Sequence, residues 1–328
     1  VNLPNLPEDV RVGDTVLLDD GAMQLRVLGK EGSDVSCRVT VGGVLTEGRG
    51  LVVPGMPTPG PFITDSLRQD ILFAIGQKPD YLALSFVSTS ADVAEVKAIL
   101  HENGADIPIV AKIERGEAVR RFAGILDISD GIMVARGDLG ADIPLERVPL
   151  VQKELIQKCN RAGKPVITAT QMLESMVNSL RPTRAEATDV ANAIFDGSDA
   201  IMLSAETSIG KYPVQAVRTM TKIAKETEAR LPYEQILRER GLWLERKTDE
   251  LISYSACHTA QRLGAVAIVA FTQSGSTAGR VSKYRPRVPI LAITSSSVVS
   301  GRVLLHWGVH PFQVAPLSSV DELFAAGA

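Results

Sequence analysis

The sequence is short of cysteine, of histidine and of long apolar runs, and each shortage argues against a class of protein. Its cysteines, Cys37, Cys159 and Cys257, lie far apart and lack the CxxC spacing of a zinc site or disulfide framework. No apolar run reaches the roughly 18 to 20 residues that a membrane-spanning helix needs, and no secretion signal is recognisable. We therefore expect a cytoplasmic protein with reduced thiols and no membrane partner.

A strong charge of one sign is also lacking. The 35 lysine and arginine residues face 38 aspartate and glutamate residues, and the formal net charge is −3. This balance gives no overall basic field and argues against nucleic acid as a partner. The 4 histidines show no metal-ligand spacing. What is present, 328 residues with 45% hydrophobic content, suffices for one large core or several modest ones.

Short alternating apolar runs, separated by Gly and Asp turns, fill the first 53 residues. They predict strands at 15–18, 24–28 and 35–41, and so a small antiparallel β-unit. The segment that follows, 53–61, contains four prolines and can continue neither a helix nor a central strand. We place the first domain boundary there, which gives a β-rich domain over residues 1–57.

A repeated pattern of strand, polar loop and amphipathic helix occupies residues 58–231 and predicts a parallel α/β sheet. Because a (β/α)₈ barrel needs eight strands, five units indicate either an open sheet or a barrel whose first three strands are missing. The predicted strands are 81–86, 109–114, 131–135, 165–170 and 200–204.

The last section, residues 232–328, predicts a second and smaller α/β domain. A charged helix over 214–240 leads into it, and 251–263 predicts another helix. Buried parallel strands are predicted at 266–271 and 288–294, with a hydroxyl-rich loop at 272–277 between the first strand and the next helix.

Polar side chains gather where the predicted barrel strands end. Lys112 and Glu114 are two residues apart on one strand and so share a face. Glu114 and Asp138 come from adjacent strand ends and could hold one hard cation, since Mg²⁺ takes one or two carboxylates plus substrate oxygens and water. Thr168 and Thr170 precede a helix start, where hydroxyl and N–H groups suit phosphate or carboxylate. A structural ion pair and a helix cap are the alternatives.

Six motifs resemble the signatures of pyruvate kinases, in the same order and with similar spacing. The resemblance extends over the whole chain, because LLDDG (17–21) and GGV (42–44) are similar to the lid domain, and 272–277 with YRP (284–286) to the C-terminal regulatory domain. The six motifs are AKIE (111–114), MVARGDLG (133–140), PLVQK (149–153), KPVITATQMLESM (164–176), RPTRAEA (181–187) and GKYP (210–213).

The resemblance implies a (β/α)₈ TIM barrel with an inserted small β-barrel lid and a C-terminal α/β domain. The implied reaction is phosphoryl transfer from phosphoenolpyruvate to ADP, giving pyruvate and ATP in glycolysis, with Mg²⁺ or Mn²⁺ as cofactor. Glu114 and Asp138 are the implied metal ligands. Lys112 is the implied cation that stabilises charge on the phosphoryl group and on the enolate.

The resemblance also implies substrate contacts. Gly137, Asp138 and Thr170 are implied to bind the substrate carboxylate, with Thr170 near the face where the enolate gains a proton. Ser85 and Phe86 match a strand end that borders the substrate.

A regulatory site is implied at the loop 272–277, which resembles a cradle for the phosphate of a sugar-phosphate or nucleotide effector. A hydroxyl-rich helix cap is the alternative. A homotetramer is also implied. The residues of this loop are Thr272, Gln273, Ser274, Gly275, Ser276 and Thr277.

In pyruvate kinases the lid follows the third barrel strand, so we expect this chain to begin inside the lid and to lack the first three strands, with the ligands of a monovalent cation such as K⁺. The end of the regulatory domain is expected to be short as well. Two other functions stay open: a metal-dependent lyase or aldolase acting through pyruvate enolate, and an inactive paralogue that binds phosphorylated metabolites.

Overall fold

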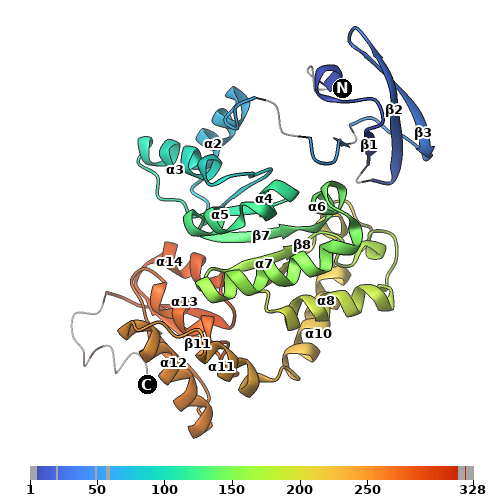
Figure 1. Ribbon diagram of the computed structural model, residues 1–328. Helices are drawn as coiled ribbons and strands as arrows, with labels where there is room; N and C mark the ends of the chain where they lie inside the picture. The colour runs from blue at the N-terminus through green and yellow to red at the C-terminus, as the bar shows by residue number, and fades with distance from the viewer. Residues whose placement is uncertain (1–5, 20, 49, 57–59, 317–321, 323–328) are drawn as a thin grey trace.

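The computed structural model describes residues 6–19, 21–48, 50–56, 60–316 and 322, and these residues form three sheets. An antiparallel N-terminal sheet and a parallel C-terminal sheet lie on opposite sides of a central parallel sheet (Figure 1). Among the described residues, every helix is too short or too polar to cross a lipid bilayer.

The N-terminal sheet has the strand order β3-β2-β1-β4, and its neighbouring strands are antiparallel. Buried Val16 and Val27 alternate with more exposed neighbours and pack on Leu6 of helix α1. The three predicted strands are confirmed, whereas the two-residue β4 was missed. Closure into a small barrel stays a prediction, as does the boundary at residue 57, which lies outside the described residues. The elements are α1 Leu6–Asp9, β1 Thr15–Leu18, β2 Met23–Glu31, β3 Asp34–Val41 and β4 Leu51–Val52.

The central sheet is parallel throughout, in the order β5-β6-β7-β8-β9. All five predicted strands are confirmed, and all but β7 end one or two residues earlier than predicted. The strands are β5 Leu82–Leu84, β6 Ile109–Ile113, β7 Gly131–Ala135, β8 Val166–Ala169 and β9 Ala200–Met202.

Helices pack on the central sheet because their apolar residues recur at helical spacing. In α7, Val151, Leu155 and Cys159 are buried, and Gly163 ends the helix with a left-handed φ of 70°. The helices of this domain are α2 Asp65–Gln77, α3 Ser90–Glu102, α4 Gly116–Arg120, α5 Phe122–Ile128, α6 Arg136–Asp142, η1 Leu145–Arg147, α7 Val148–Ala162, η2 Glu174–Val177, α8 Arg184–Asp196, α9 Ala205–Ser208 and α10 Pro213–Glu228.

The single helix predicted over 214–240 is wrong. The chain forms α10 and then a second helix, α11 (Tyr233–Gly241), with a break at Leu231 and Pro232. Proline has no N–H to donate to the preceding turn and clashes with it, so the charged pattern continues while the helix does not.

The C-terminal domain has a parallel sheet in the order β10-β11-β12. The strands predicted at 266–271 and 288–294 are confirmed as β10 and β11. Strand β12 was missed because His310 and Pro311 interrupt its apolar pattern. The elements are α11 Tyr233–Gly241, α12 Thr248–Leu263, β10 Ile268–Phe271, α13 Ser276–Lys283, β11 Ile290–Thr294, α14 Ser297–Arg302, η3 Val303–Leu305 and β12 Val309–Gln313.

Buried polar groups join the C-terminal domain to the amino ends of β8 and β9. The Asp199 carboxylate accepts the Val166 N–H (3.0 Å) and the Trp307 N–H (3.3 Å). It also pairs with Arg285 (2.9 Å), whose guanidinium lies 4.5 Å from the centroid of the Trp307 ring. Because Arg285 is only 3% exposed, this contact is part of the core between the two domains.

Candidate active site

The predicted site residues lie along one edge of the central sheet. Parallel strands end on the same side, so the residues that follow β5, β6, β7 and β8 are neighbours in that order. This edge carries Ser85 and Phe86 after β5, Lys112 and Glu114 at the end of β6, Gly137 and Asp138 after β7, and Thr170 after β8.

Glu114 connects the ends of β5 and β6. Its Oε1 atom lies 2.6 Å from Lys112 Nζ, and its Oε2 atom accepts the Phe86 N–H at 2.5 Å. Lys112 Nζ also donates to Ser85 Oγ at 2.6 Å. Phe86 has a left-handed φ of 57° while its ring stays exposed, so its backbone and not its side chain contacts the acidic group. The structure thus brings these four predicted residues together.

The Glu114 carboxylate is only 1% exposed. Burial raises the pKa of Glu114, the Lys112 ammonium and the Phe86 N–H oppose that rise, and the negative charge of Asp138 adds to it. The two carboxylates are therefore close enough to repel one another. A divalent cation between them would relieve this repulsion.

The oxygen atoms of Glu114 and Asp138 suit such a cation. Glu114 Oε1 is buried and has an ion pair with Lys112 but no well-aligned hydrogen bond. Two carboxylates with room for substrate oxygens and water suit Mg²⁺ or Mn²⁺. No group of three or more His, Cys, Asp or Glu side chains able to hold a metal occurs in the described part of the chain. Glu114 and Asp138 would supply two ligands of such a metal, and substrate oxygens and water would supply the others.

Thr170 is held against the first turn of α6, which directly follows β7. Its Oγ1 accepts the Gly137 N–H (2.8 Å) and donates to the Ala169 carbonyl (2.6 Å). A Cβ atom at position 137 would lie 3.4 Å from this hydroxyl oxygen, a tight contact. By contrast, Thr168 is fully buried and bonds to Ser198 Oγ at 2.7 Å, so it stabilises the interior.

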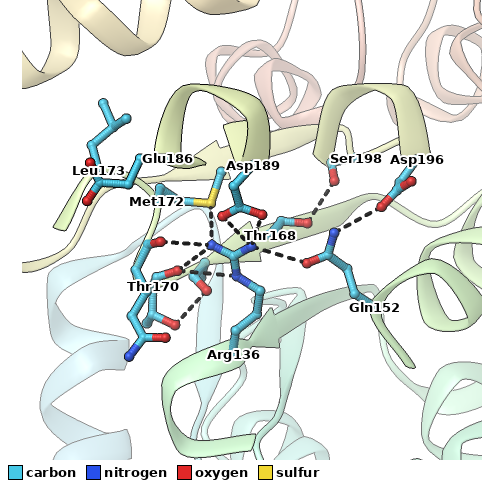
Figure 2. A network of polar contacts seen from close by, with 12 residues as sticks. Arg136, Gln152, Thr168, Thr170, Met172, Leu173, Glu186, Asp189, Asp196 and Ser198 are labelled. Atoms are coloured by element: carbon cyan, nitrogen blue, oxygen red, sulfur yellow. Dashed lines mark hydrogen bonds and ion pairs between the residues drawn. The ribbon is translucent and has the colours of Figure 1, made fainter. Parts of the chain in front are cut away.

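Buried charged groups hold the segment after Thr170, and the sequence reasoning gave them no role. Glu206, which is fully buried, accepts the N–H groups of Leu173 and Ser204, both at 2.8 Å. Arg136 donates to the Thr170 carbonyl (Figure 2). The sequence could have indicated these roles, because Arg136 and Glu206 follow predicted strands and a buried charged group requires a partner.

The loop 272–277 forms the start of α13. Thr272 is buried, and its Oγ1 accepts the Gly275 N–H at 2.8 Å. Ser274 Oγ and Ser276 Oγ are 3.1 Å apart, and Arg280 Nη1 donates to Ser276 Oγ at 3.4 Å. Gln273, Ser274, Ser276 and Thr277 are exposed. The exposed serine hydroxyls of this loop thus bond to one another and to Arg280 at the start of the helix, and the effector role of the loop stays a prediction.

A parallel α/β sheet with a lysine and two carboxylates at its carboxyl edge is the arrangement typical of α/β enzymes, whose functional residues follow the ends of the strands. Comparison with known proteins is more specific. Residues 1–217 match the family model described as pyruvate kinase, barrel domain, and residues 250–328 match pyruvate kinase, alpha/beta domain. The chain belongs to the pyruvate kinase family.

Curated relatives agree with this assignment. The chain is 46% identical to a pyruvate kinase of Clostridium acetobutylicum over 99% of its own length and 69% of that protein. It is 49% identical to a pyruvate kinase of Geobacillus stearothermophilus and 50% identical to one of Bacillus licheniformis, each over 98% of this chain and 56% of the relative. The chain therefore spans only part of the length of these relatives.

Proposed function

We propose that the protein acts as a pyruvate kinase, transferring a phosphoryl group from phosphoenolpyruvate to ADP and releasing pyruvate and ATP in glycolysis. The observation that carries the proposal is the 2.6 Å pair of Lys112 with buried Glu114, close to Asp138 at the same sheet edge. Phosphoryl transfer depends on positioning and on neutralising negative charge, and an ammonium beside two carboxylates can provide both. Family membership supports the same conclusion.

Each site residue has a proposed role. Lys112 stabilises charge on the phosphoryl group and on the enolate that remains. Gly137, Asp138 and Thr170 bind the substrate carboxylate, and Thr170 Oγ1 lies close to the carbon that is protonated. Glu114 and Asp138 would hold Mg²⁺ or Mn²⁺, which when bound neutralises charge on the transferring group.

Ser85 and Phe86 border the substrate. Ser85 is held by its contact with Lys112, and the Phe86 N–H fixes the Glu114 carboxylate. These contacts keep the lysine and the acid in place while charge moves between oxygen atoms.

We further propose the partners and the domain division that the sequence predicts. The proposed ligands are a monovalent cation such as K⁺ and a sugar-phosphate or nucleotide effector at 272–277. The protein is proposed to be a cytoplasmic homotetramer. The proposed domains are 1–57, 58–231 and 232–328. The helix break at Pro232 supports the last of these boundaries.

The test is an assay of the full-length protein encoded by the gene. With phosphoenolpyruvate, ADP and Mg²⁺, we expect ATP and pyruvate in equal amounts, with neither formed when ADP is omitted. A parallel assay supplies aldol adducts of pyruvate. Pyruvate from these adducts without ATP formation would support a lyase instead, and binding of sugar phosphates without turnover would support a metabolite-binding paralogue.

A further inference from the structure

One buried guanidinium at the site has no role in the chemistry described above. Arg136 directly follows β7, precedes Gly137 and is only 9% exposed. Its Nη2 donates to the Thr170 carbonyl at 2.7 Å and its Nε to the same oxygen at 3.3 Å. Nη2 also lies 3.2 Å from the Gln171 carbonyl oxygen and 2.8 Å from Met172 Sδ (Figure 2).

These contacts hold a backbone conformation that residues other than glycine rarely adopt. Thr170 has a φ of 69° and Gln171 a φ of 53°, so two consecutive residues other than glycine adopt the left-handed region. That conformation costs free energy and persists only where the surroundings enforce it. Here the guanidinium binds the carbonyl groups of both strained residues, while the Gly137 N–H binds the Thr170 hydroxyl.

A second set of side chains fixes Arg136 itself. Its Nη1 lies 2.7 Å from both oxygens of Asp189 in α8 and 3.4 Å from Gln152 Oε1 in α7. Gln152 Nε2 donates in turn to Asp196 Oδ2 at 3.0 Å. The dashed lines in Figure 2 follow this path from α8 and α7 through Arg136 to Thr170. The guanidinium is therefore anchored on two helices outside the sheet.

We propose that Arg136 is a positioning residue, which holds Thr170 in the left-handed conformation that places its hydroxyl for protonation of the enolate. The inference rests on the proposed function. Arg136 acts through Thr170 and Gln171 and needs no contact with substrate. A lysine at this position keeps the charge but loses the planar fork that reaches two carbonyls and two helices together.

The test compares R136K with R121K in the full-length protein. Arg121 is an exposed arginine in an ion pair with Glu117, so its replacement controls for the loss of a guanidinium. Protonation of the enolate runs backwards as loss of a methyl proton from pyruvate, which NMR follows as deuterium incorporation in D₂O. Both kcat and this exchange rate are measured, together with KM for ADP and the solvent isotope effect on kcat.

For R136K we expect an exchange rate and a kcat at least about tenfold below the parent, a KM for ADP within about twofold, and a larger solvent isotope effect. A lesion confined to folding would instead lower all rates in proportion to the folded fraction and leave the isotope effect unchanged. That result, or parental rates in folded R136K, would overturn the proposal.

Two further measurements cover the remaining outcomes. If R136K does not fold, D189N decides, because it keeps Arg136 but removes its anionic anchor. We expect the same changes in D189N, but smaller ones. A deuterium exchange rate equal to that of the parent would contradict the inference. If the parent protein itself does not convert phosphoenolpyruvate, the proposed function fails, and a crystal structure of R136K still tests the positioning, since Thr170 with φ unchanged near 69° would refute it.

Discussion

Lys112 and Glu114 form an ion pair in which the carboxylate is buried and the ammonium is not. The Glu114 side chain is 1% exposed and the Lys112 side chain 23% exposed, with 2.6 Å between Oε1 and Nζ. The Phe86 N–H fixes the other carboxylate oxygen, so the acid has little freedom to move. The lysine is the partner that can reach toward a bound anion.

Replacing this lysine tests its role in stabilising charge. We expect Lys112→Met in the full-length protein to lower phosphoryl transfer by about 100-fold or more, because the charge that develops on the transferring group loses its fixed ammonium. Metal binding, followed by titration with Mn²⁺, should remain largely intact because both carboxylates are still present. Lys97→Met is the matched control, since Lys97 pairs with Asp130 on the surface at 3.0 Å. Equal activity in Lys112→Met and the parent would contradict the assignment.

The metal assignment predicts a different pattern for Glu114→Gln. The amide keeps the shape and still accepts the Phe86 N–H, but it brings no negative charge to a hard cation. We expect Mn²⁺ affinity to fall by about tenfold or more, with a parallel loss of activity at low metal concentration. Glu117→Gln, which changes a half-buried acid nearby that pairs with Arg121, should leave both unaltered. Unchanged Mn²⁺ affinity in Glu114→Gln would remove this residue from the metal site.

The contact between Arg285 and Asp199 predicts a large effect on stability. Arg285→Met leaves Asp199, which is 10% exposed, without its cation and should cost about 3 to 5 kcal/mol. Because the pair joins two domains, calorimetry should show the C-terminal domain unfolding in a separate, earlier transition. Arg287 is exposed, so Arg287→Met serves as the control and should shift unfolding little. Similar small shifts in both variants would mean that the pair does not hold the domains together.

Glu186 predicts a pH-dependent effect. Burial alone would raise the pKa of Glu186, but hydrogen bonds from Ser175 and Thr183 outweigh it and lower the pKa overall. An acid whose pKa is lower in the folded state contributes stability above its unfolded pKa and loses that contribution as pH falls through the folded pKa. Because Glu186 is only partly buried, solvent screens part of this effect, so Glu186→Gln should lose about 0.5 kcal/mol at pH 7 and progressively less in acid. Urea unfolding from pH 7 down to about pH 3, below the lowered pKa of Glu186, measures this difference, and a constant gap would rule out the charge as its cause.

Variants of the loop 272–277 test whether its hydroxyl groups bind the proposed effector or only stabilise the loop. Thr272→Val removes the acceptor of the Gly275 N–H and should cost about 1 kcal/mol of stability. Ser276→Ala should leave stability near the parent value and weaken the binding of a sugar phosphate measured by calorimetry. Should Ser276→Ala bind sugar phosphates as well as the parent does, the loop is only a helix cap.

Strands were predictable where burial alone defined them. All residues of β7, Gly131–Ala135, are buried, and the apolar run ends where the strand ends. The pairing of Lys112 with Glu114 was predictable for the same reason, since a spacing of two places both side chains on one face of a strand. The break at Pro232 could also have been predicted, but the alternating charges around it favoured one long helix.

Other contacts depend on the tertiary structure, which the sequence pattern does not encode. The bond from Phe86 N–H to Glu114 requires a left-handed φ in a residue that rarely adopts it. The role of Arg136 depends on the adjacency of β7 and β8 and on the packing of α8, which brings Asp189 within 2.7 Å from 53 residues further along the chain. Local propensity carries no information about such partners.

The short strand β8 separates the contact between the two domains at Asp199 from Thr170 at the carboxyl edge of the central sheet. The Asp199 carboxylate binds the backbone at Val166, the first residue of β8, and Thr170 follows the last. The strand has four residues, so it spans only roughly 13 Å at about 3.3 Å per residue. A movement of the C-terminal domain that shifts Asp199 would therefore reach Thr170 through this one strand, with no other element between them.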